Sequence, residues 1–292
     1  SKITCIEEDE AGNIWIGTNG GGLNRFNRDL NIFTNFRSDD KDSFAVSGNI
    51  VNCIKKAGNG KLWIGTENGL SVLYIRTNKF YDFKSGINKK AVFKGVEVND
   101  IISGPDNIIW VATGNGLVSL DTASGQMNFF TANPSDPASI PDNTVTCLLT
   151  DRMGNLWVGT KSGLVKKGSD NNYFIRLNLQ SALSSFEIKD LLEDDNGNIW
   201  VATFGGGLDI YLPDKNKVIS NTLDYNNPNS IGHNEVLCLY KDRTGIIWAG
   251  TYGLDKYNPK KEKFILYDYL PRENVSLKSI YAIYQDRLGV LW

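Results

Sequence analysis

A chain of 292 residues accommodates one or two domains, because a single all-β domain often exceeds roughly 200 residues. Hydrophobic residues at 41% and charged residues at 22% are typical of a globular chain with a sizeable core, which excludes a disordered one. The net charge of −2 provides no basic footprint, so neither nucleic acid nor an anionic membrane surface is an expected partner of these residues.

The histidine count and the hydropathy pattern exclude further classes. One histidine, His233, excludes a metal or acid–base site built from several histidines. No run of roughly 18 apolar residues occurs, and no basic segment followed by an apolar one opens the chain. Residues 1–292 therefore contain neither a membrane span nor a signal peptide, and either the chain is cytosolic or such segments have been removed.

Every tryptophan belongs to one periodic series with spacings of 48, 47, 47, 43, 48 and 44 residues. The series is Trp15, Trp63, Trp110, Trp157, Trp200, Trp248 and Trp292. Aligned on Trp, the unit reads D-x-x-G-x-[IL]-W-[IVA]-[GA]-T, with Asp six residues before Trp in five units and Gly three before it in six. Asp that begins a type I turn and Gly with a positive φ are typical of a β-hairpin.

Each unit predicts four strands in chain order. First strands are predicted at residues 3–9, 51–57, 98–104, 145–151, 188–194, 236–242 and 280–286. The second strands are the apolar runs around each Trp, and the third strands begin at the Leu that follows a Gly-rich turn in the six complete units. Fourth strands are predicted at residues 32–36, 79–83, 128–130, 173–175, 217–225 and 263–269.

This pattern predicts an all-β fold, a seven-bladed β-propeller of four-stranded antiparallel blades with an incomplete last blade. A β-solenoid is the main alternative, but its coils are shorter and more uniform. The seventh unit stops at Trp292, within its second strand. We therefore expect residues 1–292 to form a single propeller domain of six complete repeats and half of a seventh, a fragment of a longer multidomain chain.

The four cysteines occupy one repeated position, ten residues before their own Trp. They are Cys5, Cys53, Cys147 and Cys238, and the same position holds Asp100, Asp190 and Ala282 in the other units. Equivalent positions in different blades lie farther apart than the roughly 7 Å that a disulfide spans. We predict reduced, mostly buried thiols and neither a metal site nor a cofactor, since small side chains suit crowded inner strands.

The repeat units and three linkers, residues 38–51, 133–145 and 226–236, resemble two-component regulator propeller repeats over essentially the whole chain. The second and third units depart from the pattern, with Ala57 and Gly104 where Asp is usual. The resemblance implies the periplasmic sensor region of a Bacteroides-type hybrid two-component histidine kinase. It further implies a second propeller and an Ig-like domain in the same chain, a membrane helix beyond them, and a homodimer that brings the kinases together.

Candidate ligand contacts are expected on one face of the propeller. This face carries the inter-blade linkers and the turns between the second and third strands. That face is predicted to include Asn19, Asn49, Glu67, Asn68, Asn115, Asn143, Lys161, Phe204, His233, Asn234 and Tyr252. Aromatic platforms and polar groups are typical of saccharide sites, so the candidate ligand residues are Glu67, Lys161, Phe204, Tyr252, His233 and Asn234. The repeated Trp is interpreted as core, and the Thr after it as a turn residue.

The leading hypothesis is a non-catalytic extracytoplasmic sensing and scaffold domain. By resemblance, it detects oligosaccharides released from glycans and controls genes for polysaccharide utilisation. One alternative is a propeller enzyme of the streptogramin-lyase type, whose chemistry relies on histidine and a divalent cation, and a lone histidine argues against it. Another is a pure protein-interaction or dimerisation module.

Overall fold

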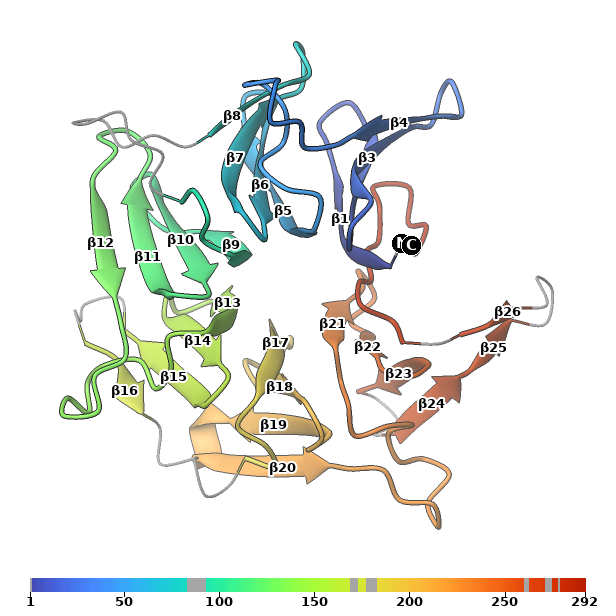
Figure 1. Ribbon diagram of the computed structural model, residues 1–292. Helices are drawn as coiled ribbons and strands as arrows, with labels where there is room; N and C mark the ends of the chain where they lie inside the picture. The colour runs from blue at the N-terminus through green and yellow to red at the C-terminus, as the bar shows by residue number, and fades with distance from the viewer. Residues whose placement is uncertain are drawn as a thin grey trace.

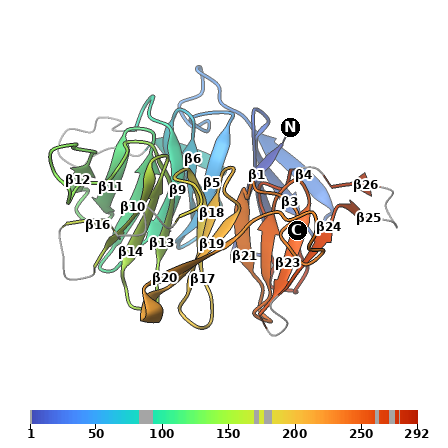
Figure 2. The same ribbon diagram turned by 90° about the horizontal axis from the view of Figure 1, so that it is seen from below.

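The computed structural model describes residues 2–82, 93–168, 173–176, 183–259, 263–270, 275–277 and 279–292. Six four-stranded antiparallel sheets surround a central channel like the blades of a propeller (Figure 1). The four strands of each sheet follow one another in chain order, so each blade is a meander. The first strand lines the channel and the fourth forms the outer edge, and the blades stand side by side when the ring is seen edge-on (Figure 2).

The first three blades contain twelve strands. They are β1 (Ile3–Glu8), β2 (Ile14–Thr18), β3 (Gly22–Asn27) and β4 (Ile32–Phe36); β5 (Val51–Gly58), β6 (Lys61–Thr66), β7 (Gly69–Tyr74) and β8 (Lys79–Asp82); β9 (Val98–Ser103), β10 (Ile108–Thr113), β11 (Gly116–Asp121) and β12 (Met127–Phe130).

The next three blades contain twelve more. They are β13 (Val145–Thr150), β14 (Leu156–Thr160), β15 (Gly163–Lys167) and β16 (Ile175–Arg176); β17 (Ile188–Glu193), β18 (Ile199–Thr203), β19 (Leu208–Leu212) and β20 (Lys217–Asn221); β21 (Cys238–Lys241), β22 (Ile247–Gly250), β23 (Leu254–Asn258) and β24 (Lys263–Tyr267). A 3-10 turn, η1 (Pro213–Lys215), precedes β20, and β25 (Tyr269–Leu270) pairs with β26 (Val275–Ser276).

The prediction of seven blades is wrong, because the described residues form six. In the seventh unit, residues 279–292 contain one isolated bridge, between Gln285 and Leu291, in place of a sheet. Residues up to Trp292 correspond only to the first two strands of a blade, and two strands without further partners form at most a marginal sheet. The segment instead lies between blade 6 and blade 1, where Asp286 pairs with Arg28 (Figure 1).

The repeated Asp organises the first hairpin of a blade. In blade 5, Asp194 Oδ1 accepts the backbone N–H groups of Asn196 and Asn198, and Oδ2 accepts the indole Nε1–H of Trp200 at 3.0 Å. Gly197 completes the turn with φ +81°, a conformation that favours glycine. The same Asp-to-Trp bond occurs in four other units, from Asp9, Asp151, Asp242 and Asp286. Because Asp and Trp are six residues apart in the repeat, one carboxylate bonds both to the backbone of the turn and to the Trp ring in the core.

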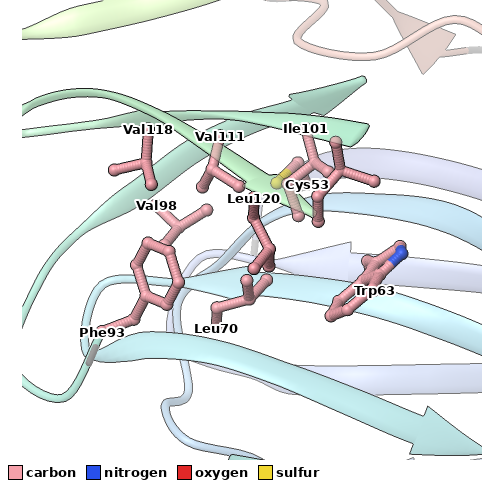
Figure 3. Packing of buried hydrophobic residues seen from close by; sticks show 10 residues of the cluster. Cys53, Trp63, Leu70, Phe93, Val98, Ile101, Val111, Val118 and Leu120 are labelled. Carbon is pink, nitrogen blue, oxygen red and sulfur yellow. The ribbon is translucent and has the colours of Figure 1, made fainter. Parts of the chain in front are cut away.

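The tryptophans pack between blades, as predicted for core residues. Trp15, Trp157 and Trp200 are at most 2% exposed, whereas Trp292 in the seventh unit is 36% exposed. Between blades 2 and 3, Trp63 and Leu70 from one sheet face Val98, Ile101 and other side chains from the next (Figure 3). Similar clusters lie at the other four interfaces between consecutive blades, so the sheets of blades 2 to 5 pack against a neighbouring sheet on both faces. Among the described residues, no helix is long and apolar enough to cross a membrane.

The cysteine position shows a pairing that the repeat alignment did not reveal. Each Cys stands opposite a Gly two residues after Trp, whereas each Asp at that position stands opposite an Ala. The pairs are Cys5 with Gly17, Cys53 with Gly65, Asp100 with Ala112, Cys147 with Gly159, Asp190 with Ala202 and Cys238 with Gly250. The Sγ atoms lie 2.3 to 2.5 Å from the point where a Cβ on the facing glycine would stand.

The two Asp side chains at this position point away from the facing residue, so that the methyl group of an alanine fits there. They hydrogen-bond to the next blade instead. Asp100 accepts the backbone N–H of Leu148 at 2.9 Å, and Asp190 accepts that of Leu239 at 2.7 Å. All four cysteines are free thiols; Cys5 is half-buried and the other three are buried, as predicted. The position is therefore structural in every blade.

Candidate functional site

The second-to-third-strand turns and the inter-blade linkers share one face of the ring, as predicted. In blade 1, the N–H groups of Gly20 and Gly22 donate to the carbonyl of Asn49 in the following linker, at 3.1 and 2.8 Å. In blades 1 to 5, the residue after the repeated Thr also donates its N–H to the carbonyl of the residue that precedes the first strand of its blade, as Phe204 does to Glu187. These bonds bring turns and linkers to the rim of the channel. We call this surface the turn face.

Three of the six candidate residues have mainly structural surroundings or stand apart. Both carboxylate oxygens of Glu67 accept linker N–H groups, from Asn49 at 3.0 Å and Ile50 at 2.9 Å. Asn234 Oδ1 accepts the N–H of Leu223 at 2.7 Å, the role that Asn49 and Asn143 have in their own linkers. Lys161 lies exposed on blade 4, away from the other candidates.

The other three, Phe204, His233 and Tyr252, converge around Glu235. Phe204 and Glu235 form an isolated bridge between blades 5 and 6, and the His233 and Tyr252 rings meet edge to face with centroids 4.4 Å apart. A hydrogen bond to Glu235 and its negative charge raise the pKa of Tyr252. Phe204 is 41% exposed and Tyr252 50%, so both rings are open to a ligand.

Basic and aromatic side chains extend this group across the rim of the channel. The ammonium of Lys189 lies 4.8 Å from the centroid of the Phe204 ring and pairs with Glu187 at 2.6 Å. Lys2 donates to the Tyr281 hydroxyl at 3.0 Å, which links blade 1 to the seventh unit. We call the set the channel-mouth cluster, and it comprises Lys2, Glu187, Lys189, Phe204, His233, Glu235, Tyr252 and Tyr281.

A break in the repeat could have identified Lys189 and Tyr281 from the sequence. In the first four blades, the residue before the cysteine position donates a side-chain hydrogen bond to a carbonyl of the next first strand. These bonds run from Thr4 to Val51, Asn52 to Val98, Asn99 to Val145 and Thr146 to Ile188. The later units carry Lys189, Leu237 and Tyr281 there. Long side chains therefore replace short structural ones on one side of the channel, beside the cluster.

Glu235 and Lys2 carried no such sequence signal. Both precede a first strand, at a repeated position that holds Glu in three units and Ile50, Thr144 and Ser279 in others, so neither residue departs from a fixed pattern. Their proximity to the aromatic rings follows from how blade 6, the seventh unit and blade 1 meet around the ring. Spacing along the chain does not reveal that arrangement.

The channel behind the cluster has a volume of about 650 Å³, and the inner strands that line it carry buried charges. Burial raises the pKa of Asp100, and it raises that of Asp190 to about 7. The Asp100 carboxylate in turn raises the pKa of Lys55. Burial also raises the pKa of the Cys5 thiol to about 12, so the thiols of the channel are protonated and poorly nucleophilic.

The arrangement suits binding better than proton transfer. The N–H of Glu235 donates to His233 Nδ1 at 2.9 Å, so the neutral imidazole carries its proton on Nε2 and offers a donor there, without the lone pair that a general base needs. Within the described ranges, no three His, Cys, Asp or Glu side chains are grouped closely enough to hold a metal ion. The cluster thus presents rings, hydrogen-bond donors and carboxylates to a ligand.

Comparison with known proteins identifies the repeats. The profile of the two-component regulator propeller matches five segments, residues 1–20, 45–68, 139–162, 183–205 and 230–253. The chain carries two-component regulator propeller repeats. Each matched segment contains the first two strands of a blade, and four of the five also contain the end of the linker that precedes them. No curated protein matches the chain.

Solved structures with a similar fold include extracellular domains and an enzyme. The extracellular domain of a protein described as a hybrid two-component system from B. thetaiotaomicron is 21% identical, with a TM-score of 0.79; the match covers all of this chain and 38% of that one. A second such domain from B. thetaiotaomicron is 17% identical, with a TM-score of 0.56, over all of this chain and 44% of that one. The propeller repeats described here thus span less than half of those extracellular domains.

The enzyme is a virginiamycin B lyase from Staphylococcus aureus, in a variant made catalytically inactive by replacing one histidine with alanine. It is 12% identical, with a TM-score of 0.63, and the match covers 91% of this chain and 84% of that one. At identities of 12 to 21%, these three structures support the propeller fold of this chain and nothing further.

Proposed function

We propose that this chain is a ligand-sensing, non-catalytic part of the extracytoplasmic region of a hybrid two-component sensor histidine kinase. The observation that carries the proposal is the channel-mouth cluster on a propeller of two-component regulator repeats. Phe204 and Tyr252 supply open ring faces, while Glu235, Lys2 and the His233 imidazole supply hydrogen-bonding groups around them. Exposed rings flanked by polar groups at the rim of a channel suit an oligosaccharide.

The wider role follows from the same resemblance. The ligand would be a glycan-derived oligosaccharide, sensed in the periplasm, and binding would change the output of a kinase that controls polysaccharide-utilisation genes. A second propeller, an Ig-like domain and a homodimer would connect the cluster to the membrane. The lyase alternative is disfavoured because the single histidine uses Nδ1 as an acceptor of a backbone N–H.

Calorimetry of the complete sensor region against a panel of glycan oligosaccharides tests the proposal. We expect one class of oligosaccharide to bind, and Tyr252→Ala or Phe204→Ala to weaken binding at least about tenfold through loss of a ring platform. Tyr225→Ala is the matched control, because Tyr225 is 92% exposed in a linker and should leave binding unchanged. Absence of binding to the whole panel, or metal-dependent turnover of a substrate, would contradict the sensor role.

A further inference from the structure

A second concave site lies on the opposite face, between blades 2 and 3. We call it the blade 2–3 groove. It has a volume of about 660 Å³, within the range of roughly 300–1,000 Å³ that small-ligand sites occupy. Its walls come from the first hairpins of both blades and from β7 and β8, and six side chains carry its chemistry. They are Lys56, Lys61, Trp63, Tyr74, Tyr81 and Asn107.

The groove lies where two successive units lack the repeated Asp. In the other five units, that carboxylate fills the space between hairpin and Trp and accepts the indole N–H. Ala57 and Gly104 stand at this position in blades 2 and 3, and both line the groove. The groove therefore lies where the sequence departs from the repeat. Trp63, which Figure 3 shows in the core between blades 2 and 3, lies at its edge.

Two tyrosines form an aromatic wall with free polar ends. Tyr74 and Tyr81 are 38% and 42% exposed, and their rings meet edge to face with centroids 5.1 Å apart. Neither hydroxyl has a hydrogen-bond partner in the described part of the chain. A phenol that packs its ring and leaves its O–H open is typical of a surface that binds a polar ring.

The charge of the groove is positive. The ammonium of Lys61 lies 4.6 Å from the centroid of the Tyr74 ring and has no carboxylate partner among the described residues. Lys56 has only a distant ion pair, 3.6 Å to Glu7, and is 48% exposed. Among the described residues that line the groove, Asp82 is the single acidic one. An anionic group in the groove would thus meet two ammonium groups of which one is unpaired.

We propose that the blade 2–3 groove binds an acidic saccharide, a sugar ring that carries a carboxylate or sulfate. The sugar ring lies against Tyr81, its hydroxyls bond to the phenol groups and the Asn107 amide, and its anionic group pairs with Lys61. This proposal rests on the saccharide-binding function proposed above, and it adds a second site, whose ligand is negatively charged.

Calorimetry of the full chain with two acidic probes, tetragalacturonate and a chondroitin sulfate tetrasaccharide, tests the groove, and neutral maltotetraose serves as the uncharged control. We expect at least one acidic probe to bind more tightly than maltotetraose and to lose affinity at high salt. Lys61→Met and Tyr81→Ala should each weaken that binding at least about tenfold. Lys61→Arg should retain it, because the positive charge remains. Thermal melts verify that each variant folds.

The outcomes separate the groove from the channel-mouth cluster. Loss of acidic-probe binding in Lys61→Met, with unchanged binding in Tyr252→Ala, supports the groove. Loss in Tyr252→Ala alone overturns the groove and leaves the sensor proposal standing. If neither acidic probe binds, the groove proposal fails, while the neutral members of the oligosaccharide panel still decide the proposed function.

Discussion

At Asp190, burial acts on the carboxyl pKa against hydrogen bonds and a nearby positive charge. Its carboxylate accepts two backbone N–H groups, from Leu191 at 2.8 Å and from Leu239 of the next blade at 2.7 Å, yet it lies in the channel wall with Asp100 nearby. Burial raises its pKa to about 7 despite these bonds and the positive charge of Lys55. The folded chain therefore holds a proton on Asp190 at pH values where an unfolded chain has lost it.

The free energy of unfolding should consequently depend on Asp190 between about pH 4 and about pH 7. An unfolded Asp titrates near pH 3.9, so in this window the folded state binds more protons and stability falls as the pH rises. We expect Asp190→Asn to reduce that fall, measured by urea unfolding at several pH values. Asp195→Asn is the control, because the Lys241 hydrogen bond and charge lower the pKa of this exposed carboxyl. Equal slopes for Asp190→Asn and the parent chain would contradict the assignment.

The inner two strands of each blade depend on one facing pair of small side chains. Where Cys occupies the first strand, its Sγ takes the volume above a glycine; where Asp occupies it, the side chain turns to the next blade and alanine fits. A methyl group added to a close-packed interface displaces its neighbours, since protein interiors leave no spare volume. The two pairings are thus alternative solutions of one packing problem.

Gly17→Ala should destabilise the propeller, because its Cβ would stand 2.3 Å from Cys5 Sγ. We expect a loss of about 2 kcal/mol in the free energy of unfolding, measured with denaturant. The double variant Cys5→Asp/Gly17→Ala recreates the pairing of blade 3 and should recover part of the loss. Gly114→Ala is the control, because the nearest atom to its added Cβ lies at 3.5 Å. A double variant no more stable than Gly17→Ala would show that Sγ is not the obstacle.

Strand positions were predictable from the sequence because periodic apolar runs and turn residues are local signals. The fourth strand of blade 1 was predicted at residues 32–36 and is β4 (Ile32–Phe36). In blade 2 it was predicted at 79–83; β8 covers 79–82, and residue 83 lies outside the described residues. Phe204 and Tyr252 could be identified as departures from the repeat, and His233 as a linker residue on the same face. Their convergence on Glu235 could not, because it depends on contacts between neighbouring blades.

At the scale of the whole molecule, the seventh unit closes the ring without forming a blade. Asp286 is fully buried, accepts the indole N–H of Trp292 at 2.6 Å and pairs with Arg28 of blade 1. Arg287 pairs with Glu8 of blade 1 at 3.2 Å, and Ile280 donates its N–H to Thr251 of blade 6 at 2.8 Å. The count of seven Trp units therefore overstates the number of blades, although all seven occupy the ring.

Asp286→Ala should loosen this closure. Removing this buried carboxylate leaves the Trp292 indole N–H and the Arg28 guanidinium without their acceptor, which costs more than losing a surface ion pair. We expect faster amide hydrogen exchange in β1 and in residues 280–292, measured by mass spectrometry. Asp151→Ala removes the matching carboxylate of blade 4 and should leave exchange in β1 unchanged. Unaltered exchange of β1 in Asp286→Ala would mean that other contacts close the ring.

The alternation of Cys with Gly and Asp with Ala also distinguishes repeats that are otherwise nearly interchangeable. Tandem repeats of one motif are prone to strand exchange during folding, because the first strand of one copy resembles that of the next. An exchange between blades 2 and 3 would place Cys53 opposite Ala112, where Sγ and the methyl group collide, and Asp100 opposite Gly65, where a void opens. We therefore expect the shapes of these facing pairs to disfavour strand exchange, and with it domain swapping, between blades 2 and 3.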